Sequence, residues 1–448
     1  MPSNTTSPKN IQFPIYPASA GSRSRRDNFQ TDIVILGAGI GGYETFVTLN
    51  KLLRRHGLKK RITIVDQNNY FSFTPLNHEV AAGAVEPTHA ALPLRELTHN
   101  TPHGFLKAEV KKINPEKKIV ETSRGSIAYN YCVVAMGSST NFYNTPGAEE
   151  FCNHVRTLAG AMILRHNLIE ALESDDEQID ITVVGGGYTG VEVAGQLQHF
   201  ASHDARALYP EKRLMVRLIQ TIGTVVPQLP PKAQQKIVSR LKKMGVEILF
   251  NTKVKEVKLK SVLTDSDELL SDFTIWCAGF GNIANCFLET TYCTKDNRIP
   301  TNQHLQHANY STLYAVGDIG LIFNPGEKRP VPQLGEAAFH EGRYVAKHIM
   351  ATLGNKKLKP FSFSSKGTLM PIGERYGIGV VGGLVFGNIF AWWLRRTIYL
   401  TFMPGLLRKL RIVVDWTLRL FGFSYTIAVE RNLEHGPKNL QYNPKFKS

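Results

Sequence analysis

The fold is decided by the stretch Ile33-Val34-Ile35-Leu36-Gly37-Ala38-Gly39-Ile40-Gly41-Gly42, in which an apolar run meets a GxGxxG sequence. A helical pattern follows to about residue 56, and a second apolar run, residues 62–65, ends at Asp66. This order of elements is the pattern of a dinucleotide-binding unit: a strand, a glycine turn, a helix and a second strand that ends in an acid. The stretch therefore predicts an α/β fold built on a parallel sheet.

Each position in the glycine turn has a separate physical role. Gly37 lets the chain turn tightly off the strand, Gly39 leaves room for a pyrophosphate, and Gly42 lets the helix approach the strand. The helix that opens at Ile40 presents free N–H groups and the positive end of its dipole to a phosphate. Asp66 is placed to accept hydrogen bonds from the ribose hydroxyls of an adenosine.

The same pattern occurs a second time. Residues 181–184 form an apolar run, a glycine turn and a helix follow, and residues 214–219 form a strand that ends at Gln220. Two such units predict two bound dinucleotides, and the economical pair is FAD with a nicotinamide dinucleotide, because their rings exchange a hydride when they stack. The turn residues expected to contact the second cofactor are Gly185, Gly187, Tyr188 and Gly190.

Gln220 bears on the choice between NADH and NADPH. An acid at this position would bind the ribose hydroxyls of NADH and repel a 2′-phosphate, and glutamine removes that repulsion. The hypothesis is that the protein uses NADH but tolerates NADPH better than a relative with an acid there.

A third marker is the apolar run at residues 313–316, which ends in Gly317 and Asp318. Two-nucleotide flavoproteins hold the ribityl chain of FAD with this pattern, because the acid accepts hydrogen bonds from ribityl hydroxyls and the glycine removes bulk. The alternative is that Asp318 caps a helix. We favour the flavin role because the two glycine turns accompany it.

Composition narrows the class of protein. The length of 448 residues suits two or three domains, and the formal charge of +16 indicates an anionic partner. We find no nucleic-acid-binding motif and predict no metal site, so an acidic membrane surface is the expected partner. The five cysteines form no CxxC pair and residues 67–100 contain none, which indicates a reduced intracellular protein and excludes an enzyme that reduces disulfides.

The segment after the first unit carries a family resemblance. It contains Phe73-Thr74-Pro75-Leu76, then Val80-Ala81-Ala82-Gly83, and later Pro93-Leu94-Arg95. With these motifs the chain resembles the type II NADH:quinone oxidoreductases, and the resemblance extends over almost all of the chain beyond the N-terminal tail. It implies a single-subunit flavoenzyme that transfers hydride from NAD(P)H to FAD and then two electrons to a membrane quinone, without pumping protons.

Two other functions stay open. The first is an FAD-dependent oxidoreductase with a different acceptor, namely a specialised naphthoquinone, a soluble protein or a small oxidant. The second is a redox-sensing flavoprotein that binds both nucleotides without catalysis.

The resemblance also implies a domain division with two Rossmann-like domains. Residues 31–150 and 281–352 would form a discontinuous FAD-binding domain, residues 151–280 an inserted NAD(P)H-binding domain, and residues 353–448 an amphipathic membrane-associating region. Residues 1–30 are interpreted as a disordered tail without a secretory signal.

The resemblance assigns further cofactor contacts. The backbone near Val110 would contact the adenine of FAD. The turns that approach the cofactors in the family fall, for FAD, on Ala135, Met136 and Gly137 and, for the nicotinamide dinucleotide, on Ala278 and Gly279. Met136 replaces the threonine that is usual in related flavoproteins.

The acceptor end departs from the family. The family's Ala-Gln-x-Ala-x-Gln sequence, whose two glutamines lie near the flavin and the quinone, falls here on Gly335, Glu336 and His340. Both glutamines are therefore replaced. Glu336 and His340 share one helix face. We interpret them either as groups that handle protons during quinone reduction or as an ordinary surface pair.

Two further charged residues match family positions. Lys366, within Ser365-Lys366-Gly367-Thr368, would stabilise the anionic reduced flavin and a quinol oxyanion, or else be an ordinary exposed lysine. Glu192 matches a family glutamate near the nicotinamide and the flavin, or else is a surface charge that compensates the helix dipole.

The C-terminal part indicates a membrane surface. Residues 378–394 are nearly all apolar and long enough for a membrane-spanning helix, but their glycines favour strands and turns. Residues 406–423 mix apolar side chains with basic ones, as a helix in the plane of an acidic leaflet does. The basic residues of this region are Arg395 and Arg396 and then Arg408, Lys409, Arg411 and Arg419.

We therefore expect peripheral, monotopic attachment. The alternatives for these helices are a homodimer interface or packing on the body of the protein. The membrane would be the plasma membrane, on its cytoplasmic face, or an organellar inner membrane in a eukaryote.

Overall fold

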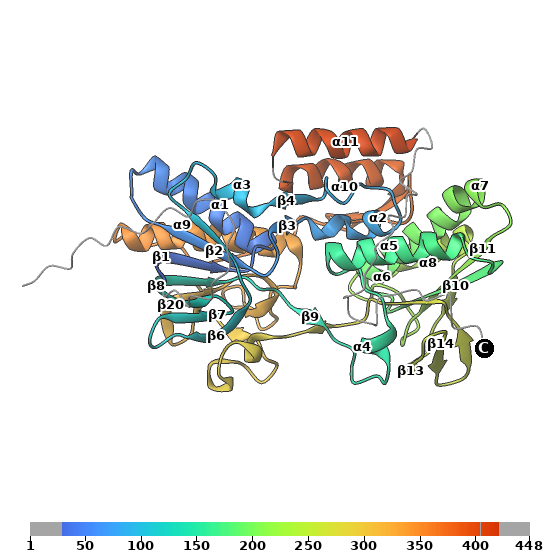
Figure 1. Ribbon diagram of the computed structural model, residues 1–448, viewed down its shortest axis with the longest axis horizontal. Helices are drawn as coiled ribbons and strands as arrows, with labels where there is room; N and C mark the ends of the chain where they lie inside the picture. Colours follow the sequence, from blue (N-terminus) through green and yellow to red (C-terminus); the bar gives the residue numbers. More distant parts are fainter. Residues whose placement is uncertain (1–28, 404, 421–448) are drawn as a thin grey trace, which may run out of the picture.

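The computed structural model describes residues 29–403 and 405–420. Two sheets with parallel central strands lie side by side in Figure 1, each flanked by helices, and two C-terminal helices lie across the top. Most of the predicted tail lies outside the described residues. Its last two residues, Phe29 and Gln30, were assigned wrongly, because they already pair within the first strand.

The first sheet collects strands from distant parts of the chain, in the order β19-β20-β8-β1-β2-β5. Its central strands are apolar runs buried on both faces, as expected for parallel strands covered by helices. The strands are β1 (Phe29–Leu36), β2 (Ile62–Asp66), β5 (Gly104–Lys107), β8 (Gly125–Val134), β19 (Gln306–His307) and β20 (Tyr310–Ala315), and the hairpin β6 (Val110–Asn114) and β7 (Ile119–Thr122) joins at β8. Helices α1 (Ile40–Arg55) and α9 (Gly335–Leu353) pack against each other.

The second sheet repeats the arrangement with four parallel strands in the order β12-β11-β10-β16. These are β10 (Gln178–Val184), β11 (Arg213–Ile219), β12 (Glu247–Leu249) and β16 (Phe273–Trp276). The accompanying helices are α5 (Leu158–Leu172), α6 (Tyr188–Phe200) and α8 (Pro231–Met244), and a hairpin sheet is formed by β13 (Val254–Val257), β14 (Ser261–Thr264) and β15 (Glu268–Leu270). The two units predicted from the glycine motifs are thus both confirmed as strand–turn–helix–strand.

Two short strands connect the sheets. The chain leaves the first sheet through β9 (Ser139–Thr140) and returns through β17 (Phe280–Gly281), and these two strands pair antiparallel. Figure 1 shows β9 bridging the two halves at the lower centre. Shorter elements complete the fold: β3 (Tyr70–Ser72), α2 (Asn77–Ala81), β4 (Ala91–Pro93), α3 (Leu94–Thr98), α4 (Ala148–Phe151), α7 (Arg206–Leu208), β18 (Ile299–Pro300) and β21 (Gly320–Leu321).

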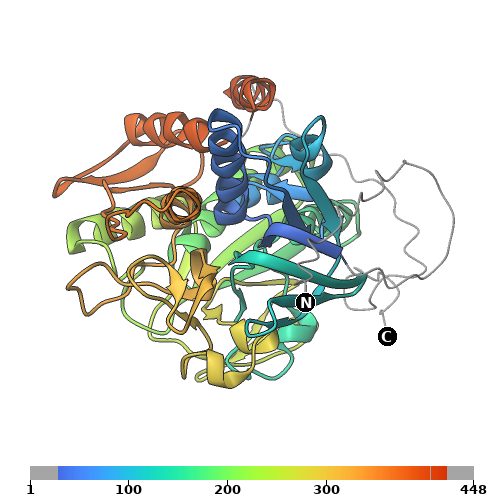
Figure 2. The same ribbon diagram turned by 90° about the vertical axis from the view of Figure 1, so that its left-hand side faces the viewer.

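The C-terminal segment forms a small sheet and two helices. The strands β22 (Thr368–Pro371), β23 (Gly377–Val381) and β24 (Leu384–Asn388) are antiparallel, so the preference for strands and turns is confirmed for residues 378–388. It is wrong for residues 389–394, which begin a helix. Helices α10 (Ile389–Phe402) and α11 (Leu406–Leu420) follow, and α11 forms the top edge of the molecule in both views (Figures 1 and 2). Among residues 29–403 and 405–420, no helix has the length and apolarity needed to span a bilayer. The last three residues of the predicted helix, 421–423, lie outside the described residues.

Candidate nucleotide and acceptor site

The first glycine turn has the geometry that the sequence predicted. Gly37 has a φ of +90°, and a Cβ there would lie 2.5 Å from the carbonyl oxygen of Ala135. A Cβ on Gly42 would overlap the carbonyl oxygen of Gly37, so only glycine permits this approach of helix to strand. Gly39 differs, because a Cβ there would have no protein atom within 4 Å. Packing explains two of these glycines, and Gly39 borders free space.

The second turn has the same geometry. Gly185 has a φ of +105°, and a Cβ on Gly190 would overlap its carbonyl oxygen. A Cβ on Gly187 would again have no protein atom within 4 Å. In both units the open glycine immediately precedes the helix, at Ile40 and at Tyr188, where unpaired N–H groups point outward.

Asp66 and Gln220 have equivalent places beneath the two turns. Asp66 accepts hydrogen bonds from the N–H groups of Ala38 and Asn68, each at 2.7 Å. Burial raises the pKa of Asp66, and these two hydrogen bonds oppose that rise. Gln220 Oε1 accepts from the N–H of Gly186 at 3.0 Å, while its Nε2 donates to the Thr224 carbonyl. The amide of Gln220 therefore holds the second turn in the same way that the carboxylate of Asp66 holds the first, but it carries no negative charge.

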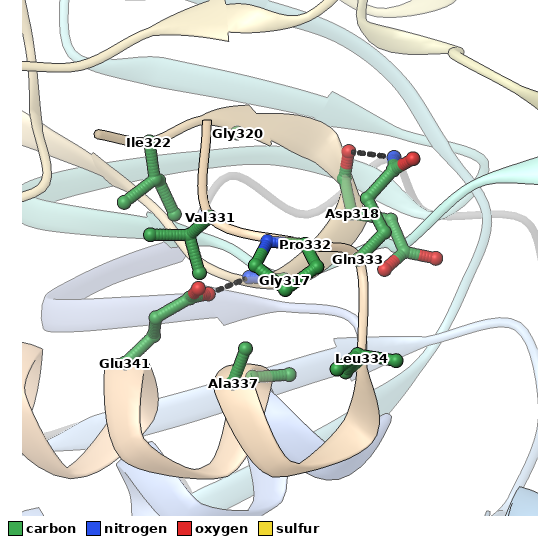
Figure 3. Close-up of a pocket in the computed structure, with 11 residues that line it drawn as sticks. Gly317, Asp318, Gly320, Ile322, Val331, Pro332, Gln333, Leu334, Ala337 and Glu341 are labelled. Carbon is green, nitrogen blue, oxygen red and sulfur yellow. Dashed lines mark hydrogen bonds between the residues drawn. The ribbon is translucent and has the colours of Figure 1, made fainter. Parts of the chain in front are cut away.

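The turn at Gly317 faces the N-terminal end of α9. The N–H of Gly317 donates to Glu341 at 2.6 Å, and Gln333 Nε2 donates to the carbonyl of Asp318 at 2.9 Å (Figure 3). Burial raises the pKa of Glu341 to about 7, opposed by the hydrogen bond from Gly317. The carboxylate of Asp318 accepts from Ser138 Oγ at 2.5 Å. Asp318 thus lies in a polar turn beside the first unit.

Arg156 was not predicted as a site residue, and it joins this turn to the crossing strands. Its Nε donates to the Ser138 carbonyl at 2.9 Å, and its Nη2 lies 3.5 Å from Asp318. Its guanidinium covers the ring of Phe280 at 5.2 Å. Because its partners come from the residue before β9, from β17 and from the Gly317 turn, no local sequence pattern could have identified it.

The remaining predicted cofactor residues gather around one or other glycine turn. Ala135, Met136 and the following Gly137 pass directly beside Gly37. A Cβ on Gly335 would lie 3.0 Å from Ile40 Cδ1, so the start of α9 touches the start of α1. Val110 opens β6, just after Ala108, whose N–H donates to the carbonyl of Asp66. Ala278 and Gly279 lie at the second turn, since a Cβ on Gly185 would be 2.8 Å from the Ala278 nitrogen.

Three of the four proposed catalytic residues come together between α9 and the segment before β22. Ser365 Oγ donates to Glu336 at 3.3 Å. Burial lowers the pKa of His340, the charge of Glu336 raises it, and the cations Arg343 and Lys366 lower it further. Glu336 and His340 therefore lie close to the segment that carries Lys366.

Glu192 lies deeper, where the two units meet α10. Its carboxylate is 3.6 Å from Arg395 Nη2 and 3.9 Å from His78 Nδ1. Burial raises the pKa of Glu192 to about 7, and the charge of Arg395 opposes the rise while that of Glu79 adds to it. The reading of Glu192 as a dipole-compensating surface charge is wrong, because the side chain is only 16% exposed.

Arg395 belongs to a buried cluster of charges that we did not predict. Its Nη1 donates to Glu79 at 3.1 Å, and Arg396 and the indole N–H of Trp416 contact the other Glu79 oxygen at 3.5 and 2.9 Å. Burial raises the pKa of Glu79, but Arg396 and Arg395 outweigh it and lower the pKa to about 2. The expectation that Arg395 and Arg396 face a leaflet is wrong, because both are almost fully buried.

Comparison with known proteins identifies the family of this chain. It belongs to the pyridine nucleotide-disulphide oxidoreductase family, whose sequence pattern matches residues 31–342. It is 28% identical to the type II NADH:quinone oxidoreductase of Haemophilus influenzae, over 78% of this chain and 86% of that one. It is 27% identical to a probable NADH dehydrogenase of Dictyostelium discoideum, over 87% of this chain and 90% of that one.

A solved structure shares the fold. NDH2 of Plasmodium falciparum, determined in complex with NADH, superimposes with a TM-score of 0.79 at 17% identity, over 90% of this chain and 100% of that one. The α/β fold is therefore confirmed, and so is the resemblance to type II NADH:quinone oxidoreductases that the sequence motifs indicated.

Proposed function

We propose that this protein is a single-subunit flavoenzyme that oxidises NADH through FAD and passes two electrons to a membrane quinone, without pumping protons. The observation that carries the proposal is the pair of superimposable glycine turns, each with one glycine open to free space. Both turns lie where parallel strands end and a helix begins, which is where dinucleotides bind in open α/β sheets. The names of the relatives agree with this assignment.

The residues of the first unit fit FAD. Gly39 leaves room for the pyrophosphate, Asp66 offers oxygens to a ribose, and Asp318 offers its carboxylate to the ribityl chain. When bound, FAD accepts a hydride and releases two electrons to an acceptor. The other contacts that we assign to FAD are Gly37, Ile40, Gly42, Val110, Ala135, Met136, Gly137, Gly317 and Gly335.

The residues of the second unit fit a nicotinamide dinucleotide. Gly187 leaves room for its pyrophosphate, with Gly185, Tyr188, Gly190 and Gln220 around it. Ala278 and Gly279 line the end of the neighbouring strand β16. Glu192, with a pKa of about 7, is suited to hold or release a proton at the meeting point of the two units.

The acceptor is a quinone in this proposal because Glu336, His340 and Lys366 form a polar group beside the start of α9. We assign Glu336 and His340 to proton delivery and Lys366 to stabilising a developing oxyanion. The loss of both family glutamines also favours the rival function, an enzyme with a different acceptor. Steady-state turnover of NADH with a panel of quinones and soluble oxidants distinguishes the two, and an absence of turnover with every acceptor would indicate the redox sensor.

Replacing Gln220 with glutamate should increase the preference of the protein for NADH over NADPH. We expect Gln220→Glu to lower kcat/KM for NADPH by about 10–100-fold, because the new carboxylate repels a 2′-phosphate. The kcat/KM for NADH should change by less than about 3-fold. Gln178→Glu, at the opposite end of β10, adds the same charge away from the site and should leave the NADH/NADPH ratio unchanged. A wild-type preference for NADH that Gln220→Glu does not alter would contradict the hypothesis.

Helix α11 supports attachment to a membrane surface because its exposed face is apolar. Its outward face is apolar, with Leu406 and Leu407 each 73% exposed and Leu410 52% exposed. Its inward face mixes the buried apolar side chains Ile412 and Trp416 with a buried cation, because Arg419 pairs with Glu374 at 2.6 Å and also with Asp204. A helix that turns its apolar face outward needs an apolar environment there. We propose that this environment is an anionic leaflet, on the cytoplasmic face of a plasma membrane or on an organellar inner membrane.

If the exposed face of α11 binds a membrane, negative charges introduced on that face should strongly weaken vesicle binding. The triple variant Leu407→Asp, Leu410→Asp, Val414→Asp should weaken binding to anionic vesicles by at least about 100-fold, since each buried leucine contributes about 1.5–3 kcal/mol. Turnover with a soluble quinone analogue should persist. The matched control carries aspartate at three exposed leucines of the second unit, Leu208, Leu259 and Leu270, and should bind as wild type does. A triple variant that keeps its vesicle affinity but changes from dimer to monomer would assign the face to a homodimer instead.

A further inference from the structure

The carboxyl end of β16 is where the second unit would receive the nicotinamide half of a dinucleotide. The strand order β12-β11-β10-β16 reverses direction at β10, which makes the gap between β10 and β16 the switch point of this sheet. Gln220 lies at the end of β11, on the adenosine side. The other half of the cofactor must then pass over the turn at Ala278 and Gly279, beyond β16.

Tyr143 covers that turn. A Cβ on Gly279 would overlap the Tyr143 hydroxyl and would lie 2.6 Å from Cζ of the same ring. Gly279 has a φ of +70° and no side chain, as suits a position that a ligand approaches closely. The tyrosine ring therefore occupies the space over Gly279 that a bound dinucleotide would need.

The loop that carries Tyr143 is tied to the turn by Trp276. The indole N–H of Trp276 donates to the carbonyls of Asn141 and Ala278, each at 2.9 Å. Asn141 Oδ1 in turn accepts from the N–H of Tyr143 at 2.8 Å. Tyr143 and Asn144 both have left-handed φ values, 51° and 54°, a conformation that is uncommon for tyrosine. The loop therefore holds the ring over Gly279 at a conformational cost.

The Tyr143 ring has open space beside it into which it can move. Tyr143 is 62% exposed, so leaving Gly279 uncovers little buried surface. An open cavity of about 770 Å³ is lined by the loop of Tyr143, residues 139–145, on one side and by Phe280, Gly281 and Asn282 on the other, so the ring already borders it. A swing of the side chain into this cavity would open Gly279 without moving either sheet.

We propose that Tyr143 is a gate on the nicotinamide half of the second unit: its ring covers Gly279 in the free protein and moves into the adjoining cavity when the dinucleotide binds. This inference rests on the proposed function, because it takes the second unit as the NADH site. The apparent affinity is then the intrinsic affinity reduced by the fraction of molecules in which the gate is open.

Removing the ring should therefore strengthen binding. With the full-length, FAD-loaded protein, we expect Tyr143→Ala to bind NAD⁺ about 3–10-fold more tightly by calorimetry, and to lower the KM for NADH by a similar factor. Tyr143→Phe, which keeps the ring, should stay within about 2-fold of wild type. Leu259→Ala, at another exposed apolar side chain of the second unit, is the matched control and should change neither value.

A second pair of variants tests the contact itself. Gly279→Ala should weaken NAD⁺ binding, and Tyr143→Ala should then add less than its gain in the wild-type background, because the methyl group overlaps the ring and already displaces it from the turn. Unchanged or weaker binding by Tyr143→Ala, or strictly additive effects in the double variant, would overturn the gate. If wild type binds NAD⁺ normally in that case, only the gate fails. If neither wild type nor any variant binds NAD⁺, the proposed function fails as well.

Discussion

Replacing Gly39 with valine should remove FAD while leaving the protein folded. Gly39 has φ and ψ of −68° and −172°, an extended conformation that valine adopts readily, and a Cβ there meets no protein atom within 4 Å. The valine side chain would occupy the open space that we assign to the pyrophosphate. We expect a colourless protein whose Kd for FAD rises by at least about 100-fold, as measured by flavin fluorescence, with the thermal midpoint of the apoprotein unchanged.

Two matched variants sharpen this test. Gly187 has the same backbone conformation and the same open space, so Gly187→Val should keep FAD but lose NADH binding. Gly42→Val should instead prevent folding, because a Cβ there overlaps the backbone of Gly37. If Gly39→Val bound FAD as wild type does, the first turn would not be the FAD pyrophosphate site.

Removing the carboxylate of Glu79 should destabilise the protein strongly. Glu79→Ala leaves Arg395 and Arg396 buried without their shared counter-ion, which is expected to cost about 3–5 kcal/mol. The free energy of unfolding from denaturant titrations at fixed FAD concentration measures the loss. The stability that this contact contributes also depends on pH. The pKa of Glu79 falls from 4.5 to about 2 on folding, so its contribution is fully present above pH 4.5 and is lost as the pH falls towards 2.

The control for this prediction is an exposed ion pair on the same C-terminal region. Arg408 of α11 lies 2.8 Å from Glu96, whose side chain is 56% exposed. Because solvent screens that pair, Glu96→Ala should cost no more than about 1 kcal/mol. Equal losses for Glu79→Ala and Glu96→Ala would contradict the description of Glu79 as the counter-ion of a buried cluster.

The parts of the site that could be predicted from the sequence are those fixed by local geometry. The positive φ of Gly37, the contact of Gly42 with Gly37 and the open space at Gly39 all belong to one turn, and the second unit repeats them. Asp66 likewise ends the strand next to its own turn, and its hydrogen bonds are to Ala38 and Asn68. These positions needed no knowledge of the rest of the chain.

The parts that could not be predicted depend on contacts between distant segments. Glu79 and Arg395 are 316 positions apart, so the sequence around Arg395 does not show which acid lies beside it. The amphipathic pattern of α11 was recognised, but periodicity does not say which face points inward. Here the face that carries Ile412, Trp416 and Arg419 packs on the body, which is why Arg419 was misassigned to a leaflet. Tyr143 stands in a loop, where no periodic pattern exists.

The central claim is that two dinucleotides meet so that NADH reduces FAD and a quinone reoxidises it. The most direct measurement is the anaerobic absorption spectrum of the purified protein during a titration with NADH, followed by addition of a soluble quinone analogue. We predict a flavin spectrum that one equivalent of NADH bleaches and that the quinone restores with the same stoichiometry. A flavin spectrum that NADH leaves unchanged, or a protein that takes up no flavin, would contradict the account.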